Sequence, residues 1–294
     1  MKIGVMVTVT EKNSEIAQLA QRIEALGFES VWVPEHPIIP VHIYARFPNS
    51  ADGQVPESYA YWADPFVALT AAATATTTLK LATGICLPPE RDALVTAKVV
   101  ASLDLLSKGR VILGVGGGAL REETEIMGTK FGLRWKRLRE TVEAMKELWT
   151  KEEASYQGEF VRFPPVKSYP KPYQKPYPPV LLGAHGPKGL ARVARYCEGW
   201  VPFGVSPEAA RESIATITQL AREAGRNLQT FDVTIMITPE NGSLSLDLIR
   251  QYRDAGVNRL VLFSQLLLEG SGEMKQILTH LEQLASVVEK AQKV

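Results

Sequence analysis

The stretch "RVILGVGGGALREE" at residues 110–123 decides between two candidate α/β folds. It runs from an apolar strand pattern into a cluster of glycines. Gly114, Gly116 and Ala119 satisfy the loose G-x-G-x-x-G/A fingerprint of dinucleotide-binding Rossmann domains. That fingerprint also needs an acidic residue about 20 positions further on, at the end of a second strand. Residues 134–149 have the pattern of an amphipathic helix instead. The sequence therefore disfavours an NAD site and favours a strand end where a flat or phosphate-bearing ligand approaches the backbone.

Working outward from this strand, short apolar runs alternate with helix-patterned segments along the whole chain. Each predicted strand is followed by a predicted helix, and Gly27 and Asp92 supply a typical helix end and a typical helix start. The predicted strands lie at residues 2–9, 30–36, 79–88, 110–118, 179–184, 199–204, 231–238 and 258–263. Eight β–α units in 294 residues predict an α/β fold, a (β/α)8 TIM barrel that forms a single domain over 1–294.

Two insertions interrupt the rhythm, one after the second predicted strand and one before the fifth. Residues 37–63 follow the carboxyl end of a strand, where barrel enzymes carry their active sites, so we expect a wall or lid of the active site there. Its apolar and aromatic side chains predict a moderately hydrophobic substrate pocket walled by Ile38, Ile39, Tyr44, Phe47, Tyr59, Tyr61 and Trp62. Residues 151–179, rich in proline, could form an interdomain linker. The βα rhythm resumes directly afterwards, which favours an ordered excursion stiffened by proline.

Composition narrows the class of partner. The formal net charge of +1 offers no overall field that would attract nucleic acid or an acidic membrane. The N-terminus, "MKIGVMVTVTEKN", is typical of a first strand rather than a signal peptide, and no apolar run approaches the roughly 20 residues of a membrane span. Cys86 and Cys197 form no CxxC pair, which argues against structural zinc. We therefore expect a cytoplasmic protein with two buried, reduced thiols that acts on a small molecule.

Glu35 and His36 end the second predicted strand and are the candidate catalytic residues. A histidine at that end of a barrel is well placed as a general acid or base, since its side chain exchanges protons near neutral pH. The alternative is a histidine that only bonds to the loop it precedes. No second histidine or carboxylate stands at metal-ligand spacing, so no metal site is predicted.

The segment "LLGAHGPKGLARVAR" at residues 181–195 is the strongest phosphate candidate. Its turn, Gly183-Ala184-His185-Gly186, leaves backbone N–H groups free, and Pro187 favours a helix start whose positive dipole end faces the turn. Lys188, Arg192 and Arg195 follow at spacings that can form one basic stripe along the helix.

Four segments in this order resemble the luciferase-like monooxygenase superfamily, and more closely its branch of oxidoreductases that depend on the deazaflavin coenzyme F420. The segments are "LGFESVWVPEH", "DPFVALTAAATATTTLKLATGICLPPERDALVTAKVVASLDLLSKGRVILGVGGG", "FGLRWKRLRETVEAMKELWT" and "PPVLLGAHGPKGLARVARYCEGWVPFG", which cover most of residues 26–204. The resemblance implies a (β/α)8 barrel with insertions, in which a flavin or deazaflavin ring lies at the carboxyl mouth. It also implies a homodimer.

The resemblance assigns roles to individual positions. It implies a non-prolyl cis peptide at Gly84–Ile85 or Ile85–Cys86, and a ring-side loop at Gly116, Gly117 and Gly118. It places the phosphate at Gly183, Ala184, His185 and Gly186, and it sets His36 beside the substrate. Sugar-phosphate dehydrogenases of this family carry a glutamate just after the ring-side glycines, where this chain has Ala119 and then Glu122 and Glu123. That departure argues against a sugar-phosphate substrate.

The function predicted from these features is hydride transfer between coenzyme F420 and a small, moderately hydrophobic organic substrate. The basic stripe after the phosphate loop favours F420, whose phosphate is a diester that continues into lactate and an acidic glutamate tail. A terminal FMN phosphate would need only the N–H groups of the turn. Three alternatives remain: an FMN-dependent monooxygenase, a non-catalytic flavin- or deazaflavin-binding protein, and a cofactor-free lyase or isomerase.

Overall fold

A computed structural model of the chain describes residues 1–44, 46–47, 52–227, 230–239, 242–270 and 272–294. Its parallel strands close into one barrel in the order β1-β10-β9-β8-β7-β4-β3-β2. Their bounds are β1 Lys2–Met6, β2 Ser30–Val33, β3 Lys80–Thr83, β4 Val111–Val115, β7 Val180–Leu182, β8 Gly199–Trp200, β9 Asp232–Ile237 and β10 Arg259–Leu262. Every barrel strand lies inside a predicted one, so the (β/α)8 prediction is confirmed.

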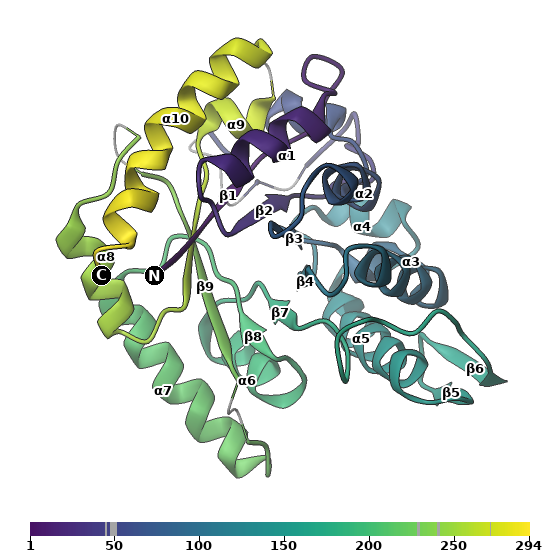
Figure 1. Cartoon of the computed structure of the whole chain (residues 1–294). Coiled ribbons are helices and arrows are strands. Elements are labelled where there is room, and N and C mark those ends of the chain that lie inside the picture. The colour runs from purple at the N-terminus through teal and green to yellow at the C-terminus, as the bar shows by residue number, and fades with distance from the viewer. Residues whose placement is uncertain (45, 48–51, 228–229, 240–241, 271) are drawn as a thin grey trace.

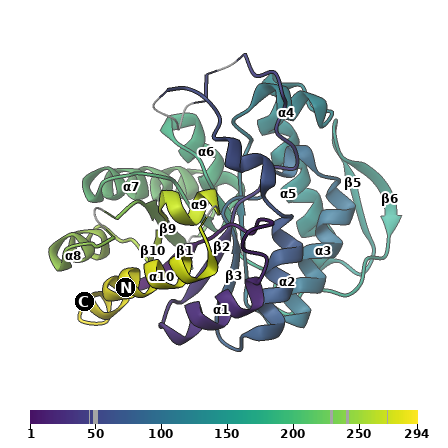
Figure 2. The same cartoon turned by 90° about the horizontal axis from the view of Figure 1, so that it is seen from above.

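The helices surround the strands, and the two chain ends lie side by side on one flank (Figures 1 and 2). Asp64 caps α2 by accepting hydrogen bonds from two backbone N–H groups, and Asp92 caps α3 by accepting one, as its position predicts. Gly27 follows α1 with a φ of 81°, the left-handed conformation that glycine supplies at a helix end. The helices are α1 Ile16–Ala25, α2 Pro65–Ala75, α3 Ala93–Leu106, α4 Arg121–Ile126, α5 Arg134–Thr150, α6 Gly186–Tyr196, α7 Pro207–Glu223, α8 Leu246–Asp254, α9 Gln265–Glu269 and α10 Met274–Ala291.

Two apolar layers hold the barrel together. The larger one lies between the strands and the outer helices, as the alternation of apolar segments predicts. The smaller one fills the interior of the barrel with Met6, Trp32, Ala82, Ile112, Leu181, Val201, Met236 and Val261. Because the interior is filled, the barrel is a packed core rather than a pore, and a ligand can be held only at an end.

The second insertion is ordered and is not a linker. It forms an antiparallel hairpin of β5 Ala154–Gln157 and β6 Arg162–Val166, which stands beyond α5 at the edge of the molecule (Figures 1 and 2). The hairpin is fastened to α5, since Tyr156 Oη donates to Glu143 at 2.6 Å and the backbone N–H of Phe160 donates to Glu140 at 2.7 Å. The expectation of an ordered excursion is therefore confirmed, although its strands were not predicted.

The first insertion is anchored to the last part of the chain. Its last turn is a 3-10 helix, Glu57–Tyr61, and the indole N–H of Trp62 donates to the carbonyl oxygen of Leu268 at 3.0 Å. Leu268 belongs to α9, a short helix between β10 and α10 that was not predicted. In the part of the chain that the structure describes, no helix is both long enough and apolar enough to cross a membrane.

The amino end of the barrel is closed by a buried ion cluster. Arg259, at the start of β10, is 2% exposed and donates to Glu29 at 2.7 and 2.9 Å. It also donates to Asp232 at 2.9 Å and to the Thr234 hydroxyl at 2.8 Å. Each carboxylate of this cluster therefore has a charged partner, which is the condition for burying charge at low cost.

Candidate active site

A cavity of about 760 Å³ opens at the carboxyl end of the barrel, within the range of small-molecule and cofactor sites. Met6, Ile85, Val201 and Met236, which belong to the apolar filling of the barrel or pack against it, line its inner part. Phe47, Tyr59 and Trp62 from the first insertion line its rim. Ile38, Ile39, Tyr44 and Tyr61 are not among the lining residues, so only part of the insertion faces the cavity.

The cavity brings together residues from four separate sequence segments. Of the predicted site residues, the following line it: Glu35, His36, Gly84, Ile85, Gly117, Gly118, Gly183, Ala184 and His185. Cys86, Gly116 and Gly186 are not among the lining residues. Cys86 is fully buried, and burial, with the nearby Glu35 carboxylate, raises the pKa of its thiol. Gly186 is exposed at the first turn of α6.

The peptide bond between Gly84 and Ile85 is cis, which confirms the expected non-prolyl cis peptide at the end of the third barrel strand. The Ile85 side chain then occupies the space beside the glycines of two neighbouring loops. A Cβ at Gly116 would lie 2.1 Å from Ile85 Cδ1, and one at Gly183 would lie 2.9 Å from the same atom. These two glycines therefore make room for the Ile85 side chain.

Glu35 is a buried carboxylate that holds the loop after this cis peptide. It accepts a hydrogen bond from the backbone N–H of Leu87 at 2.7 Å and one from Arg91 Nε at 2.5 Å. Arg91 also pairs with Asp64, the cap of α2. Both oxygens of Glu35 thus have partners in neighbouring elements, an arrangement that fixes the loop relative to β2.

His36 forms a hydrogen-bonded dyad with Glu123 at the cavity. Its Nδ1 lies 2.8 Å from Oε2 of Glu123, whose side chain is completely buried. The imidazole ring stacks against Tyr59, with 5.3 Å between ring centroids, and lies 5.4 Å from the Trp62 ring. The carboxylate and the rings fix the orientation of the imidazole, and Nε2 is left for a ligand in the cavity.

A second carboxylate, Glu90, lies behind this dyad. It accepts a hydrogen bond from the Thr124 hydroxyl at 2.9 Å, next to Glu123 in sequence. Burial raises the pKa of Glu90 to about 8, and the negative charges of Glu123 and Glu35 add to the effect. Glu123 Oε1 and Glu90 Oε2 are both buried without a hydrogen-bond partner. Unsatisfied buried carboxylate oxygens are uncommon and often mark functional sites.

Sequence reasoning missed both of these carboxylates. Glu123 lies in α4 and Glu90 in the 3-10 turn Pro88–Glu90, so each belongs to a different βα connection from His36. The pair Glu122–Glu123, noted only as lying beyond the ring-side loop, was the available signal. Gly118 packs against one of these carboxylates. Its φ is 78°, and a Cβ there would lie 2.8 Å from Glu90 Oε1.

The turn at residues 183–186 presents the amino end of α6 to the cavity. Trp200 Nε1 donates to the carbonyl oxygen of Ala184 at 2.8 Å, which fixes the turn. His185 is the N-cap residue but its side chain makes no capping hydrogen bond, and Pro187 has no N–H. The remaining N–H groups of the first turn, with the positive end of the helix dipole, can therefore bind an anion.

This geometry fits a flat cofactor that carries a phosphate. The inner cavity is apolar, the amino end of α6 can hold the phosphate, and the orphaned oxygen of Glu123 lies beside a histidine that can move a proton. Among the described residues, no group of three His, Cys, Asp or Glu side chains is placed to hold a metal ion.

Comparisons with known proteins place the chain in one family. The family model for luciferase-like monooxygenases matches residues 1–284. A protein of Mycobacterium tuberculosis (strain H37Rv) described as uncharacterized is 42% identical over 203 residues, covering 68% of this chain and 72% of the relative. The F420-dependent glucose-6-phosphate dehydrogenase of Amycolatopsis mediterranei is 29% identical over 229 residues, covering 76% of this chain and 64% of that enzyme.

A solved structure extends the comparison to the whole fold. An F420-dependent secondary alcohol dehydrogenase, solved with an F420–acetone adduct, superposes with a TM-score of 0.76. The two chains are 19% identical, and the match covers 99% of this chain and 98% of the other. At this identity the likeness concerns the fold.

Proposed function

The chain belongs to the luciferase-like monooxygenase family, and from that premise we propose that it is a coenzyme F420-dependent oxidoreductase. It would transfer a hydride between the cofactor and a small, moderately hydrophobic organic substrate. The observation that carries the proposal is the His36–Glu123 dyad, which faces a cavity that can also hold a flat ring and a phosphate. The name of the dehydrogenase relative from Amycolatopsis mediterranei supports the choice of cofactor.

The residues that would hold the cofactor come from three loops. The Ile85 side chain and the backbone of Gly117 and Gly118 would support the ring, and the first turn of α6 after His185 would bind the phosphate. When bound, F420 supplies a ring carbon that gives or takes a hydride, in place of the reactive nitrogen of a flavin.

His36 would handle the proton that accompanies the hydride. A carbonyl or imine carbon that accepts a hydride leaves negative charge on its heteroatom, and Nε2 of His36 can donate a proton there. In the reverse direction Nε2 accepts the proton from an alcohol or amine. Glu123 would hold the imidazole in place and stabilise its charged form through Nδ1. We assign Glu35 a positioning role, since both of its oxygens bind the loop at Leu87 and Arg91.

The substrate would lie between the cofactor ring and the rim of the first insertion. Phe47, Tyr59 and Trp62 offer aromatic surface there, which suits a moderately hydrophobic molecule. Glu123 lies four residues beyond Ala119, the position where the family's sugar-phosphate enzymes carry their glutamate, and its carboxylate is engaged by His36. This argues for a substrate other than a sugar phosphate.

The test is a pair of binding titrations followed by a substrate screen. Fluorescence titration of the purified protein should give micromolar or tighter binding of F420 and much weaker binding of FMN. A panel of alcohols, enones and imines with oxidised and reduced F420 should then contain compounds that are turned over. Tighter binding of FMN would assign the chain to the flavin monooxygenases. Binding of F420 without turnover of any compound would favour a carrier protein, and binding of neither cofactor would favour a cofactor-free enzyme.

A further inference from the structure

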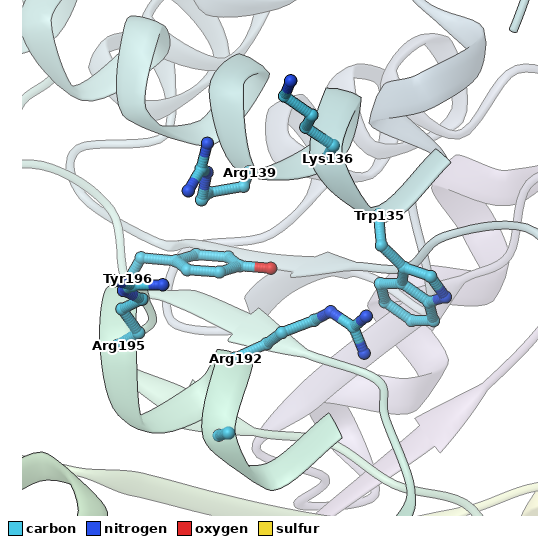
Figure 3. Close-up of a pocket in the computed structure, with 7 residues that line it drawn as sticks. Trp135, Lys136, Arg139, Arg192, Arg195 and Tyr196 are labelled. Atoms are coloured by element: carbon cyan, nitrogen blue, oxygen red, sulfur yellow. The ribbon is translucent and has the colours of Figure 1, made fainter. Parts of the chain in front are cut away.

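A second pocket, of about 390 Å³, lies between α5 and α6, outside the mouth of the barrel. We call it the α5–α6 pocket. Trp135 and Arg139 from α5 face Arg192, Arg195 and Tyr196 from α6 across it (Figure 3). Its walls are aromatic rings and the aliphatic parts of arginine side chains, and its charged groups are all cationic. The net charge of the whole chain is only +1, so this concentration of arginines is a local feature.

Several polar groups of this pocket lack partners, although Lys136, which also lines it, pairs with Glu159. Among the described residues, neither Arg192 nor Arg195 forms an ion pair with a carboxylate. The Nε of Arg139 is buried without a hydrogen-bond partner, and its nearest carboxylate oxygen, on Glu143, is 3.8 Å away. Tyr196 is only 6% exposed, and its hydroxyl is also buried without a partner. Figure 3 shows this hydroxyl pointing into the space between Arg139, Arg192 and Trp135. Unpaired cations and an orphaned hydroxyl donor together indicate a site for a carboxylate or phosphate.

The α5–α6 pocket adjoins the cavity at the barrel mouth, since Trp135 lines both. The indole ring packs on the ring-side loop, since a Cβ at Gly117 would lie 3.0 Å from Trp135 Cε2. Arg192 lies 4.6 Å from the centre of the same indole. Arg134, next along the chain, lines the main cavity, and burial together with the charges of Arg192 and Arg121 lowers its pKa. A band of positive charge therefore runs from the main cavity past Trp135.

We propose that the α5–α6 pocket binds the acidic glutamate tail of coenzyme F420, with carboxylates of the tail paired to Arg139, Arg192 and Arg195. This inference rests on the proposed function. The set of basic residues differs from the predicted stripe. Lys188 does not line the pocket, whereas Arg139 of α5 lines it, and the sequence did not connect that residue with α6. The cationic pocket suits the tail, because the tail is a flexible chain of carboxylates that continues beyond the phosphate. Arginine pairs with a carboxylate through two parallel hydrogen bonds, and an arginine stacked on tryptophan is already oriented for it.

The deciding experiment measures how affinity depends on tail length. Fluorescence titrations would compare F420 without glutamates and F420 with several glutamates, using the wild-type protein, the double variant Arg139→Gln/Arg195→Gln and the control Arg211→Gln. Arg211 is an exposed arginine of α7 outside the pocket. In the wild type and the control, the long tail should tighten binding about tenfold, which is the gain expected from a few partly exposed ion pairs. The double variant should lose most of this gain. The gain should also shrink at high salt, because exposed charge pairs are screened.

Tyr196→Phe gives an independent test of the same pocket. The substitution removes a buried hydroxyl that has no partner, so it should not lower the free energy of unfolding. It should weaken binding of long-tailed F420 about three- to tenfold, the range of one hydrogen bond, and leave tail-free F420 unaffected.

The two proposals can fail separately. If tail-free F420 binds the wild type but added glutamates give no gain, or the double variant keeps the full gain, the tail site is refuted and the proposed function stands. If no form of F420 binds the wild type, the proposed function is refuted and the tail site with it.

Discussion

Both ends of the barrel bury charged side chains, but only at the amino end does each of these charges have a partner of opposite charge. At the amino end, Arg259 is bonded to Glu29 and Asp232, so the buried charges are paired. At the carboxyl end, Glu90 and Glu123 bury two carboxylates, and each has one oxygen without a partner. The same strands connect the two ends.

The paired charges at the amino end stabilise the fold, whereas the carboxyl end keeps groups that can react. A buried ion cluster with complete partners is tolerated because hydrogen bonds and opposite charge offset the cost of desolvation. A buried carboxylate without a full set of partners is destabilised in its charged form, and such groups are typical of sites that move protons. The amino end is therefore expected to respond to mutation through stability, and the carboxyl end through activity and pH.

The largest expected change in stability follows from removing the cation of the ion cluster at the amino end. Arg259→Leu would leave Glu29 and Asp232 partly buried without a cation, which should lower the free energy of unfolding by about 3–5 kcal/mol. Urea unfolding followed by circular dichroism measures the effect. The triple variant that also carries Glu29→Gln and Asp232→Asn should recover part of the loss, because the stranded charges are removed. A loss below about 1 kcal/mol in Arg259→Leu would show that the cluster does not hold the amino end together.

A smaller effect is that the contributions of the two ends to the free energy of unfolding should depend on pH with opposite sign. Burial alone would raise the pKa of Glu29, but hydrogen bonds and charge from Arg259 outweigh it and lower that pKa. The Glu29 contribution to stability is thus present above its ordinary pKa and is lost as pH falls through the lowered value. The pKa of Glu90 is instead raised from 4.5 to about 8, so its contribution is full below 4.5 and is lost as pH rises toward 8.

Unfolding titrations at several pH values test this contrast. Between about pH 5 and pH 8, the stability of Glu90→Gln relative to wild type should increase with pH, because the variant has no charge to bury. The penalty of Glu29→Gln should be largest near neutral pH and shrink in acid. Parallel pH profiles for wild type and Glu90→Gln would mean that Glu90 is not the strained carboxylate of the carboxyl end.

The elements of the barrel were predictable because each depends on local pattern. The strand at 110–118 and the helix that starts after Asp92 are encoded by neighbouring residues, and the structure contains both. The hairpin of β5 and β6 was hidden because Pro164 and Pro165 lie within β6, where prolines argue against a strand. Residues 265–269 were likewise too short a helical segment to be distinguished from a loop.

The carboxylates of the site could not be found in this way. His36, Glu90 and Glu123 follow three different barrel strands, and only closure of the barrel brings them together. Their grouping is a property of long-range packing, whereas the turn at residues 183–186 is visible as a local glycine pattern. The same reason explains Gly116 and Gly183, whose role depends on the distant Ile85 side chain.

The most direct test of the proposed mechanism is the rate of a single turnover of F420 in His36→Ala, with a substrate found in the screen and the deazaflavin absorbance as readout. His42→Ala is the matched control, since His42 is an exposed histidine of the first insertion. We predict that His36→Ala lowers the rate about 100-fold or more while the Kd for the cofactor changes little, and that His42→Ala matches the wild type. An unaltered rate in His36→Ala would contradict the assignment of His36 as the proton-handling residue.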